Sequence, residues 1–335
     1  MDPNYTKAET RTFHLPDGRT LSFAVFGAGV ETFNNNNNNN TTTPSSPTQQ
    51  GHSCPTAVLF YFHGFPSSHE EAAIFHRAAC RHAVQLIALD RPGHAGSNFQ
   101  SNRRIVDWPA DVLAFADYFA IPRFGVLGLS GGAPYVFACW KAIPRERLVA
   151  AGVCSGLYPP ELGYAGMLLQ GRVMLTVAPW IAPVVAWGMD MSLGRAARDE
   201  ARPERFVGIV LEDLKTRPGV DRDVLDGDVG GVRSAMLASV RDAVVPGGWG
   251  PARDVKLAGS YWGFEIGELE VGDGEMVWWH GGEDVNVPVG LAERAAECVP
   301  GAELRSVEGE GHVSLVVRKA DEVISTLSGM LRKAS

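Results

Sequence analysis

The sequence predicts an α/β fold, with a mostly parallel eight-stranded sheet, helices on both faces and an inserted helical cap. Apolar runs such as AVLFYFHG (57–64), VQLIALD (84–90) and RFGVLGLS (123–130) alternate with helical segments. Continuous apolar runs are typical of parallel strands that are covered on both faces. The alternation stops at about residue 159 and resumes with EMVWWHG (275–281), which predicts an insertion.

Each element follows from its local pattern. Residues 11–27 (RTFHLPDGRTLSFAVFG) predict a hairpin, because two alternating runs flank the turn pair Asp17 and Gly18. The further expected elements are strand 57–64, helix 69–83, strand 84–90, helix 105–120, strand 123–130, helix 131–143, strand 148–156, strand 275–281, helix 291–298, strand 303–309 and helix 314–332. The expected domains are a core over 1–158 and 257–335 and a helical cap over 159–256.

Residues 34–50, NNNNNNNTTTPSSPTQQ, contain almost no apolar side chain. Such a segment cannot bury enough surface to offset the entropy of ordering, so we expect a disordered loop insertion. The most apolar stretch, 173–189, is short for a membrane span and contains two prolines. We therefore expect a buried or pocket-lining helix pair there, without stable membrane insertion.

Composition narrows the function classes. The formal net charge of -8 gives no basic surface for nucleic acid, so no nucleic-acid partner is expected. Five cysteines occur without CxxC pairing, and the first residues lack the apolar stretch of a secretory signal, which favours reduced thiols and a cytoplasmic location. No metal-ligand spacing and no G-x-G-x-x-G after a strand occur, so neither metal nor cofactor is expected. The oligomeric state stays open.

The strongest chemical signal is G-x-S-x-G at Gly128–Gly132, between a predicted strand and a predicted helix. Glycines flank Ser130 because side chains there would collide with neighbouring backbone in so tight a corner. A glycine-rich turn with an incidental serine is the alternative. The strand before the motif and the helix after it favour a nucleophile at Ser130.

Four further motifs stand in a recognisable order: HGFP (63–66), DRPGHAGS (90–97), HGGEDVNVP (280–288) and GEGH (309–312). With the serine motif, they resemble the α/β-hydrolase superfamily over nearly the whole chain outside the insertion and the cap. The resemblance implies a triad of Ser130, Asp284 and His312, in that chain order. It also implies oxyanion donors on the backbone of Phe65 and Gly131.

Several residues compete for these roles. Among nine histidines, only His312 lies in the glycine-flanked loop after the last strand. His63 is interpreted as a structural residue that hydrogen-bonds the oxyanion loop, and His94 as a candidate substrate contact. Glu283 and Asp284 are adjacent, and the acid-loop spacing favours Asp284. The apolar cap residues expected to line a pocket are Met167, Leu168, Leu169, Trp180, Ile181, Val184 and Trp187, with Trp180 and Trp187 as the principal substrate contacts.

The expected activity is hydrolysis of a carboxylic ester, thioester or lactone through an acyl-enzyme, on a small acyl substrate with an apolar group. Serine at the nucleophile position argues against epoxide hydrolases and haloalkane dehalogenases, which attack with a carboxylate. Three alternatives stay open: an acyltransferase, a carbon–carbon bond hydrolase, and a ligand-binding protein that retains the triad without turnover.

Overall fold

The computed structural model describes residues 5, 7–30 and 57–334, so the tract 34–50 predicted to be disordered lies outside the described residues. At its centre is an eight-stranded sheet in the order β1-β2-β4-β3-β5-β6-β7-β8. The strands are β1 (Arg11–His14), β2 (Thr20–Gly27), β3 (Ala57–Phe62), β4 (Val84–Leu89), β5 (Phe124–Leu129), β6 (Leu148–Cys154), β7 (Met276–Gly281) and β8 (Glu303–Val307). β1 and β2 pair antiparallel, and β2 pairs antiparallel with β4, whereas β3 to β8 are parallel. The predicted mostly parallel sheet is confirmed.

Side chains of the central strands alternate between two hydrophobic cores. In β3, Phe60 and Phe62 join the core on one face of the sheet, and Leu59 and Tyr61 join the core on the other. This period of two explains why the strand reads as a continuous apolar run: both of its faces are buried.

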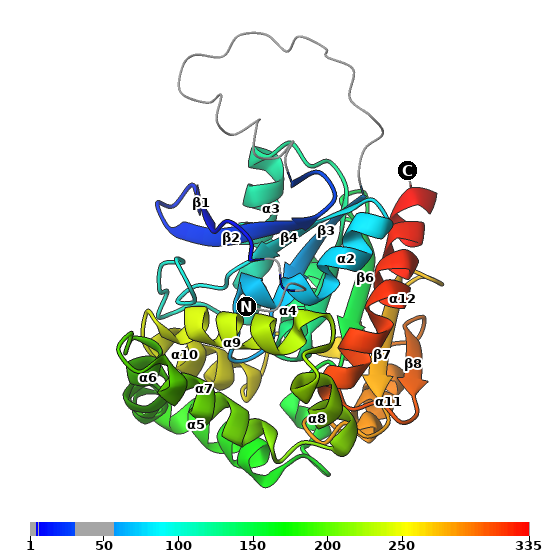
Figure 1. The fold of residues 1–335 in the computed structure, drawn as a ribbon. Helices are drawn as coiled ribbons and strands as arrows, with labels where there is room; N and C mark the ends of the chain where they lie inside the picture. The colour runs from blue at the N-terminus through cyan, green and yellow to red at the C-terminus, as the bar shows by residue number, and fades with distance from the viewer. Residues whose placement is uncertain (1–4, 6, 31–56, 335) are drawn as a thin grey trace.

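Helices cover both faces, as the sequence predicts (Figure 1). The first core is completed by α3 (Trp108–Tyr118), α4 (Ala133–Ala142) and α11 (Val289–Cys298). The second is completed by the 3₁₀ segment η1 (His69–Phe75), α2 (His76–Arg81) and α12 (His312–Lys333). α12 begins at His312 and not at Ser314, because Asp221 accepts hydrogen bonds from the first backbone N–H groups of that turn.

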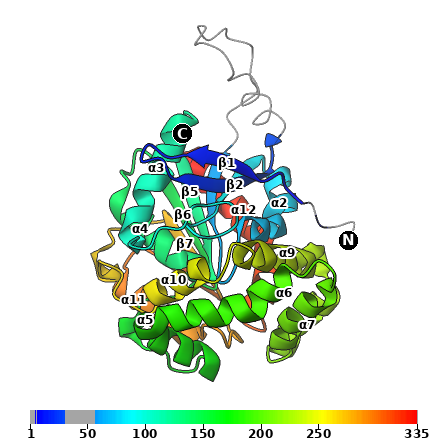
Figure 2. The ribbon, with the colours of Figure 1, turned by 90° about the vertical axis from the view of Figure 1, so that its left-hand side faces the viewer.

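Between β6 and β7 the chain forms a helical insertion that lies at the edge of the sheet where the parallel strands end (Figures 1 and 2). Its helices are α5 (Leu169–Met189), the π segment η5 (Asp190–Gly194), α6 (Arg195–Ala197), α7 (Pro203–Leu214), α8 (Gly219–Asp226), α9 (Val232–Val244) and α10 (Trp249–Ala258). Carboxyl ends of parallel strands are where α/β folds place their sites. The insertion is therefore positioned to contact such a site.

Two glycines set the packing of α5 against α10. A Cβ on Gly248 would lie 2.0 Å from the carbonyl oxygen of Ala186, and a Cβ on Gly259 would lie 2.0 Å from that of Leu175. Both distances are far below van der Waals contact, so only glycine lets the two helices approach this closely. The pairs also show that α5 and α10 run antiparallel.

We predict that Gly259→Ala destabilises the protein by about 1–3 kcal/mol, because the added methyl group forces α5 away from α10. The matched control is Gly208→Ala in α7, where an added Cβ meets nothing within 4 Å. That substitution should raise stability by about 0.5–1 kcal/mol, because alanine favours the helix. Chemical denaturation measures both, and equal effects of the two substitutions would refute this packing argument.

Candidate active site

Ser130 stands on a strained turn directly after β5. Its φ is +52°, in the left-handed region that side-chain-bearing residues rarely adopt. A Cβ on Gly132 would lie 2.1 Å from the carbonyl oxygen of Phe62, and one on Gly128 would lie 2.9 Å from Gly132. The flanking glycines are therefore required by sterics, and the turn presents Ser130 at the carboxyl edge of the sheet.

A histidine and a carboxylate meet at the same edge. His312 Nδ1 lies 2.7 Å from Asp284 Oδ2, in the loops that follow β8 and β7. The other carboxylate oxygen of Asp284 accepts the backbone N–H groups of Asn286 and Val287 at 2.8 and 2.9 Å. Glu283 is exposed and its backbone N–H donates to Glu310, so its side chain does not face His312. Of the two adjacent acids, Asp284 is the one beside the imidazole.

Burial and charge act in opposite directions on this pair. Burial disfavours the imidazolium of His312, but the Asp284 carboxylate outweighs burial and raises the pKa of His312 above its ordinary value of 6.5. Burial likewise disfavours the Asp284 carboxylate, but His312 and the backbone N–H donors lower its pKa. The pair is thus suited to a histidine that gains a proton while the aspartate stays charged.

Hydrogen bonds to backbone carbonyl groups connect both Ser130 and His312 to the loop that follows β6. The carbonyl oxygen of Ser130 accepts the N–H of Leu157 at 3.0 Å, in the loop that follows β6. In the same loop, Ser155 Oγ donates to the carbonyl oxygen of His312 at 3.2 Å. The β6 loop therefore links the serine turn to the histidine loop.

The loop after β3 reaches the serine turn. A Cβ on Gly131 would lie 3.3 Å from Cβ and 3.6 Å from the backbone nitrogen of Phe65, so the two predicted oxyanion donors are neighbours. The N–H of the preceding Gly64 donates to Glu71 Oε2 at 2.7 Å. Arg91 donates to the carbonyl oxygens of His63 and Gly64 at 2.6 and 2.8 Å. The side chains of Glu71 and Arg91 therefore hold the backbone of this loop in place.

Arg91 is held in turn by a buried carboxylate of the insertion. Asp254, in α10, accepts from Arg91 Nε at 2.8 Å, from Arg103 and from the hydroxyl of Tyr135. Burial opposes the charge on Asp254, but the two guanidinium groups hold its pKa well below the ordinary range. His94 Nε2 lies 3.0 Å from the same carboxylate.

Asp221 in α8 is a second carboxylate of the insertion that reaches the site. It is fully buried and accepts the N–H groups of His312, Val313 and Ser314 at 2.8–3.1 Å. A carboxylate at this place satisfies the donors that open a helix and complements its positive end. Asp221 therefore fixes the backbone of His312. Asp221 and Asp254 carry no recognisable motif, and sequence reasoning missed both.

Other residues singled out by sequence have different surroundings. His63 is buried, with Nδ1 3.0 Å from the carbonyl oxygen of Gly64, in agreement with its structural interpretation. His94 has no exposed surface and contacts Ser67 and Asp254, so its burial favours a structural role over substrate contact. Trp180 and Trp187 are exposed on α5, on the side opposite to the residues buried against α10. The helix turns both side chains away from α10 and into solvent, and their contact with a substrate stays a prediction.

One described group of side chains has metal-ligand chemistry: His69, Glu70 and Asp242, whose ligand atoms lie within 4.8 Å of one another. Two of the three already hold protein partners. His69 Nδ1 lies 2.6 Å from Asp90, and Glu70 accepts the hydroxyl of Tyr5 at 2.6 Å. His69 and Glu70 therefore already have protein partners without a bound cation.

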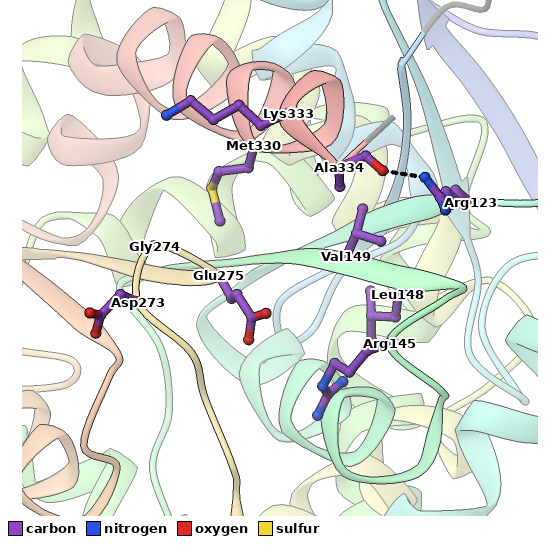
Figure 3. Close-up of a pocket in the computed structure, with 10 residues that line it drawn as sticks. All are labelled: Arg123, Arg145, Leu148, Val149, Asp273, Gly274, Glu275, Met330, Lys333 and Ala334. Atoms are coloured by element: carbon purple, nitrogen blue, oxygen red, sulfur yellow. Dashed lines mark hydrogen bonds between the residues drawn. The ribbon is translucent and has the colours of Figure 1, made fainter.

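A hollow of about 410 Å³ lies at the opposite edge of the sheet, where β6 begins and α12 ends (Figure 3). Its lining mixes the cations Arg123, Arg145 and Lys333 with Asp273 and Glu275, and Arg123 bonds the carbonyl oxygen of Ala334 across it. Amino ends of parallel strands are not where α/β folds place reactive groups. The hollow is therefore separate from the serine turn.

Comparisons with known proteins agree with this fold. A family model described as "Alpha/beta hydrolase family" matches residues 58–326. Among curated proteins, none matches the sequence significantly. Solved structures with a similar fold include an enol-lactonase from Burkholderia xenovorans LB400 (15% identity, 96% of this chain and 100% of that one, TM-score 0.60) and a thermophilic esterase from Thermogutta terrifontis (15%, 98% and 99%, 0.61). An epoxide hydrolase from Vigna radiata is similar to the same extent (16%, 97% and 98%, 0.60).

We predict that Asp221→Asn lowers the free energy of unfolding by about 1–3 kcal/mol, because the three N–H groups that open α12 lose a charged acceptor. It should also lower the pKa of His312, since Asp221 is one of the charges that raise it. Asp223→Asn, an exposed change on the same helix, is the control. Denaturation and NMR titration of the imidazole measure the two effects. An unchanged His312 pKa would contradict the assigned position of Asp221.

Proposed function

Since the chain belongs to the alpha/beta hydrolase family, we propose that it is a serine hydrolase that cleaves a carboxylic ester through an acyl-enzyme. The observation that supports this most directly is the 2.7 Å contact between His312 Nδ1 and Asp284 Oδ2. This contact lies at the sheet edge that carries Ser130 on a strained turn. The three side chains together supply a nucleophile, its base and the acid that orients the base.

In the proposed reaction, Ser130 Oγ attacks the ester carbonyl while its proton passes to His312 Nε2. The tetrahedral intermediate collapses, the carbon–oxygen bond to the alcohol breaks, and the alcohol leaves with the proton from His312. Water then attacks the acyl-enzyme and gives a proton to His312, which returns it to Ser130 as the carboxylic acid is released. Asp284 stays ionised throughout and stabilises the imidazolium.

The oxyanion would be stabilised by the backbone N–H groups of Phe65 and Gly131. Gly64 cannot take this role, because its N–H is bonded to Glu71. Losing one donor of this kind costs about 3–4 kcal/mol in comparable sites. The bonds from Arg91 to the loop carbonyls hold these donors in place before the substrate binds.

An ester-type bond is favoured because a serine, and not a carboxylate, occupies the nucleophile position. Esterases and an enol-lactonase are also among the proteins of similar fold. Segment 166–168 lies beside the acid loop, since the N–H of Leu168 donates to the carbonyl oxygen of Val285. Met167, buried in the apolar core, would offer the substrate an apolar wall there.

We predict that a fluorophosphonate probe labels Ser130 and that Ser130→Ala abolishes the label, because only an activated serine attacks such a probe. Peptide mapping identifies the labelled residue, and p-nitrophenyl esters of increasing acyl length measure turnover. Absence of label on folded protein would refute the serine-hydrolase proposal. Label without turnover on any acyl substrate would favour a binding protein, and product only with an added acceptor alcohol would favour an acyltransferase.

We predict that Asp284→Asn reduces turnover by roughly ten-thousandfold, whereas the matched change Glu283→Gln leaves it nearly unchanged. Only neutral His312 accepts the serine proton, so kcat/KM should rise with pH through a midpoint above 6.5. In Asp284→Asn this midpoint should move to lower pH, because the charge that raises the pKa is gone. The reverse ranking of the two variants would assign the acid to Glu283.

A further inference from the structure

Helix α5 exposes a continuous row of apolar side chains, here called the α5 stripe. Its members are Leu169, Val173, Val177, Trp180, Val184 and Trp187 in α5 and Met191 in the following segment η5. They recur every three or four residues, so they lie along one face of the helix. Trp180 is 86% exposed and Trp187 is 67% exposed, whereas tryptophan is usually well covered in folded proteins.

The stripe is fixed on the outside of the molecule. Leu175, Ala178 and Ala186 form the buried side of α5, and they fall on the helix face opposite to the stripe. α10 lies between α5 and the strands, and the close contacts at Gly248 and Gly259 lock that side in place (Figure 2). Rotation of α5 to bury the stripe would break this packing.

The exposed apolar area exceeds what a monomer normally tolerates. The stripe exposes on the order of 800 Å² of side-chain surface, and its two tryptophans contribute the largest parts of this area. The largest apolar patch of a typical monomer measures about 300–600 Å². A stable protein interface buries about 800 Å² on each partner. The stripe alone is therefore large enough for such an interface.

We propose that the α5 stripe is a homodimer interface, in which the α5 helices of two copies pack antiparallel about a two-fold axis. Apolar residues at three- and four-residue spacing form the seam by which two helices interlock. A two-fold axis near the middle of the stripe places Trp180 of one copy against Val184 of the other, and Trp187 against Val177. The same surface then serves both copies, as a two-fold interface requires.

A lipid surface is the alternative partner for the α5 stripe. The segment Leu169–Ala197 is long and apolar enough to cross a membrane by length and composition, with a mean hydropathy of 1.4 over its most apolar 18 residues. Against a lipid partner, α5 contains a single cation, Arg172, to attract lipid headgroups. The chain has a net charge of -8, so an anionic bilayer repels it. A second copy of the chain is therefore favoured.

The full-length protein tests this by light scattering after size exclusion over a wide range of concentration. We expect a mass twice the 36.0 kDa of one chain, falling to that of one chain in the double variant Trp180→Glu/Trp187→Glu. Both side chains are exposed in the single chain, so the double variant should keep its fold, which its circular dichroism spectrum checks. Tyr118→Glu on α3, also an exposed aromatic position, is the control and should stay dimeric.

Cysteine cross-linking tests the antiparallel arrangement. A mixture of the Trp180→Cys and Val184→Cys variants, whose changed positions face each other in the proposed dimer, should form an intermolecular disulfide under mild oxidation. A mixture of Leu169→Cys and Val184→Cys, whose positions do not face each other, should not. The unmodified protein controls for Cys80, an exposed free thiol. A monomer at every concentration, or a dimer that survives the double glutamate change, would overturn the proposal. Binding of a monomer to phosphatidylcholine vesicles, lost in the double variant, would overturn it in favour of lipid.

Discussion

The buried carboxylate of Asp254 is the interaction on which the geometry at the carboxyl edge of the sheet depends. It neutralises Arg91 and Arg103 in a buried region, where an unpaired charge costs several kcal/mol. Through Arg91 it fixes the carbonyl oxygens of His63 and Gly64. The backbone of the loop after β3 is thereby held in place beside the serine turn.

Asp221 fixes the backbone at His312 through hydrogen bonds, and Asp254, through Arg91, fixes the backbone of the loop after β3. Both aspartates belong to the insertion, although the groups they hold belong to the sheet domain. The insertion therefore contributes one buried carboxylate to each of the two segments that flank the serine turn. Separation of the insertion from the sheet domain would therefore break these ion pairs and hydrogen bonds.

Helix α5 shows that the location of an apolar segment in the fold depends on tertiary packing. Its sequence is compatible with a core helix, a pocket wall or a membrane span, and composition cannot separate these. The close backbone contacts at Gly248 and Gly259 select one orientation, and that orientation turns both tryptophans away from α10. The helix predicted from the sequence is present, and the expectation that Trp180 and Trp187 line a substrate pocket stays a prediction.

The sequence by itself determined the order of strands and helices, because apolar runs and their periods are local properties. It also determined the glycines around Ser130 and the choice of His312 and Asp284, since these lie in motifs with fixed spacing. The surroundings of His94 and the partners Asp221, Asp254 and Glu71 were decided only by the tertiary structure. A lone acidic residue in a helix looks solvent-exposed in sequence, and only long-range packing shows that it is buried against a loop far away in the chain.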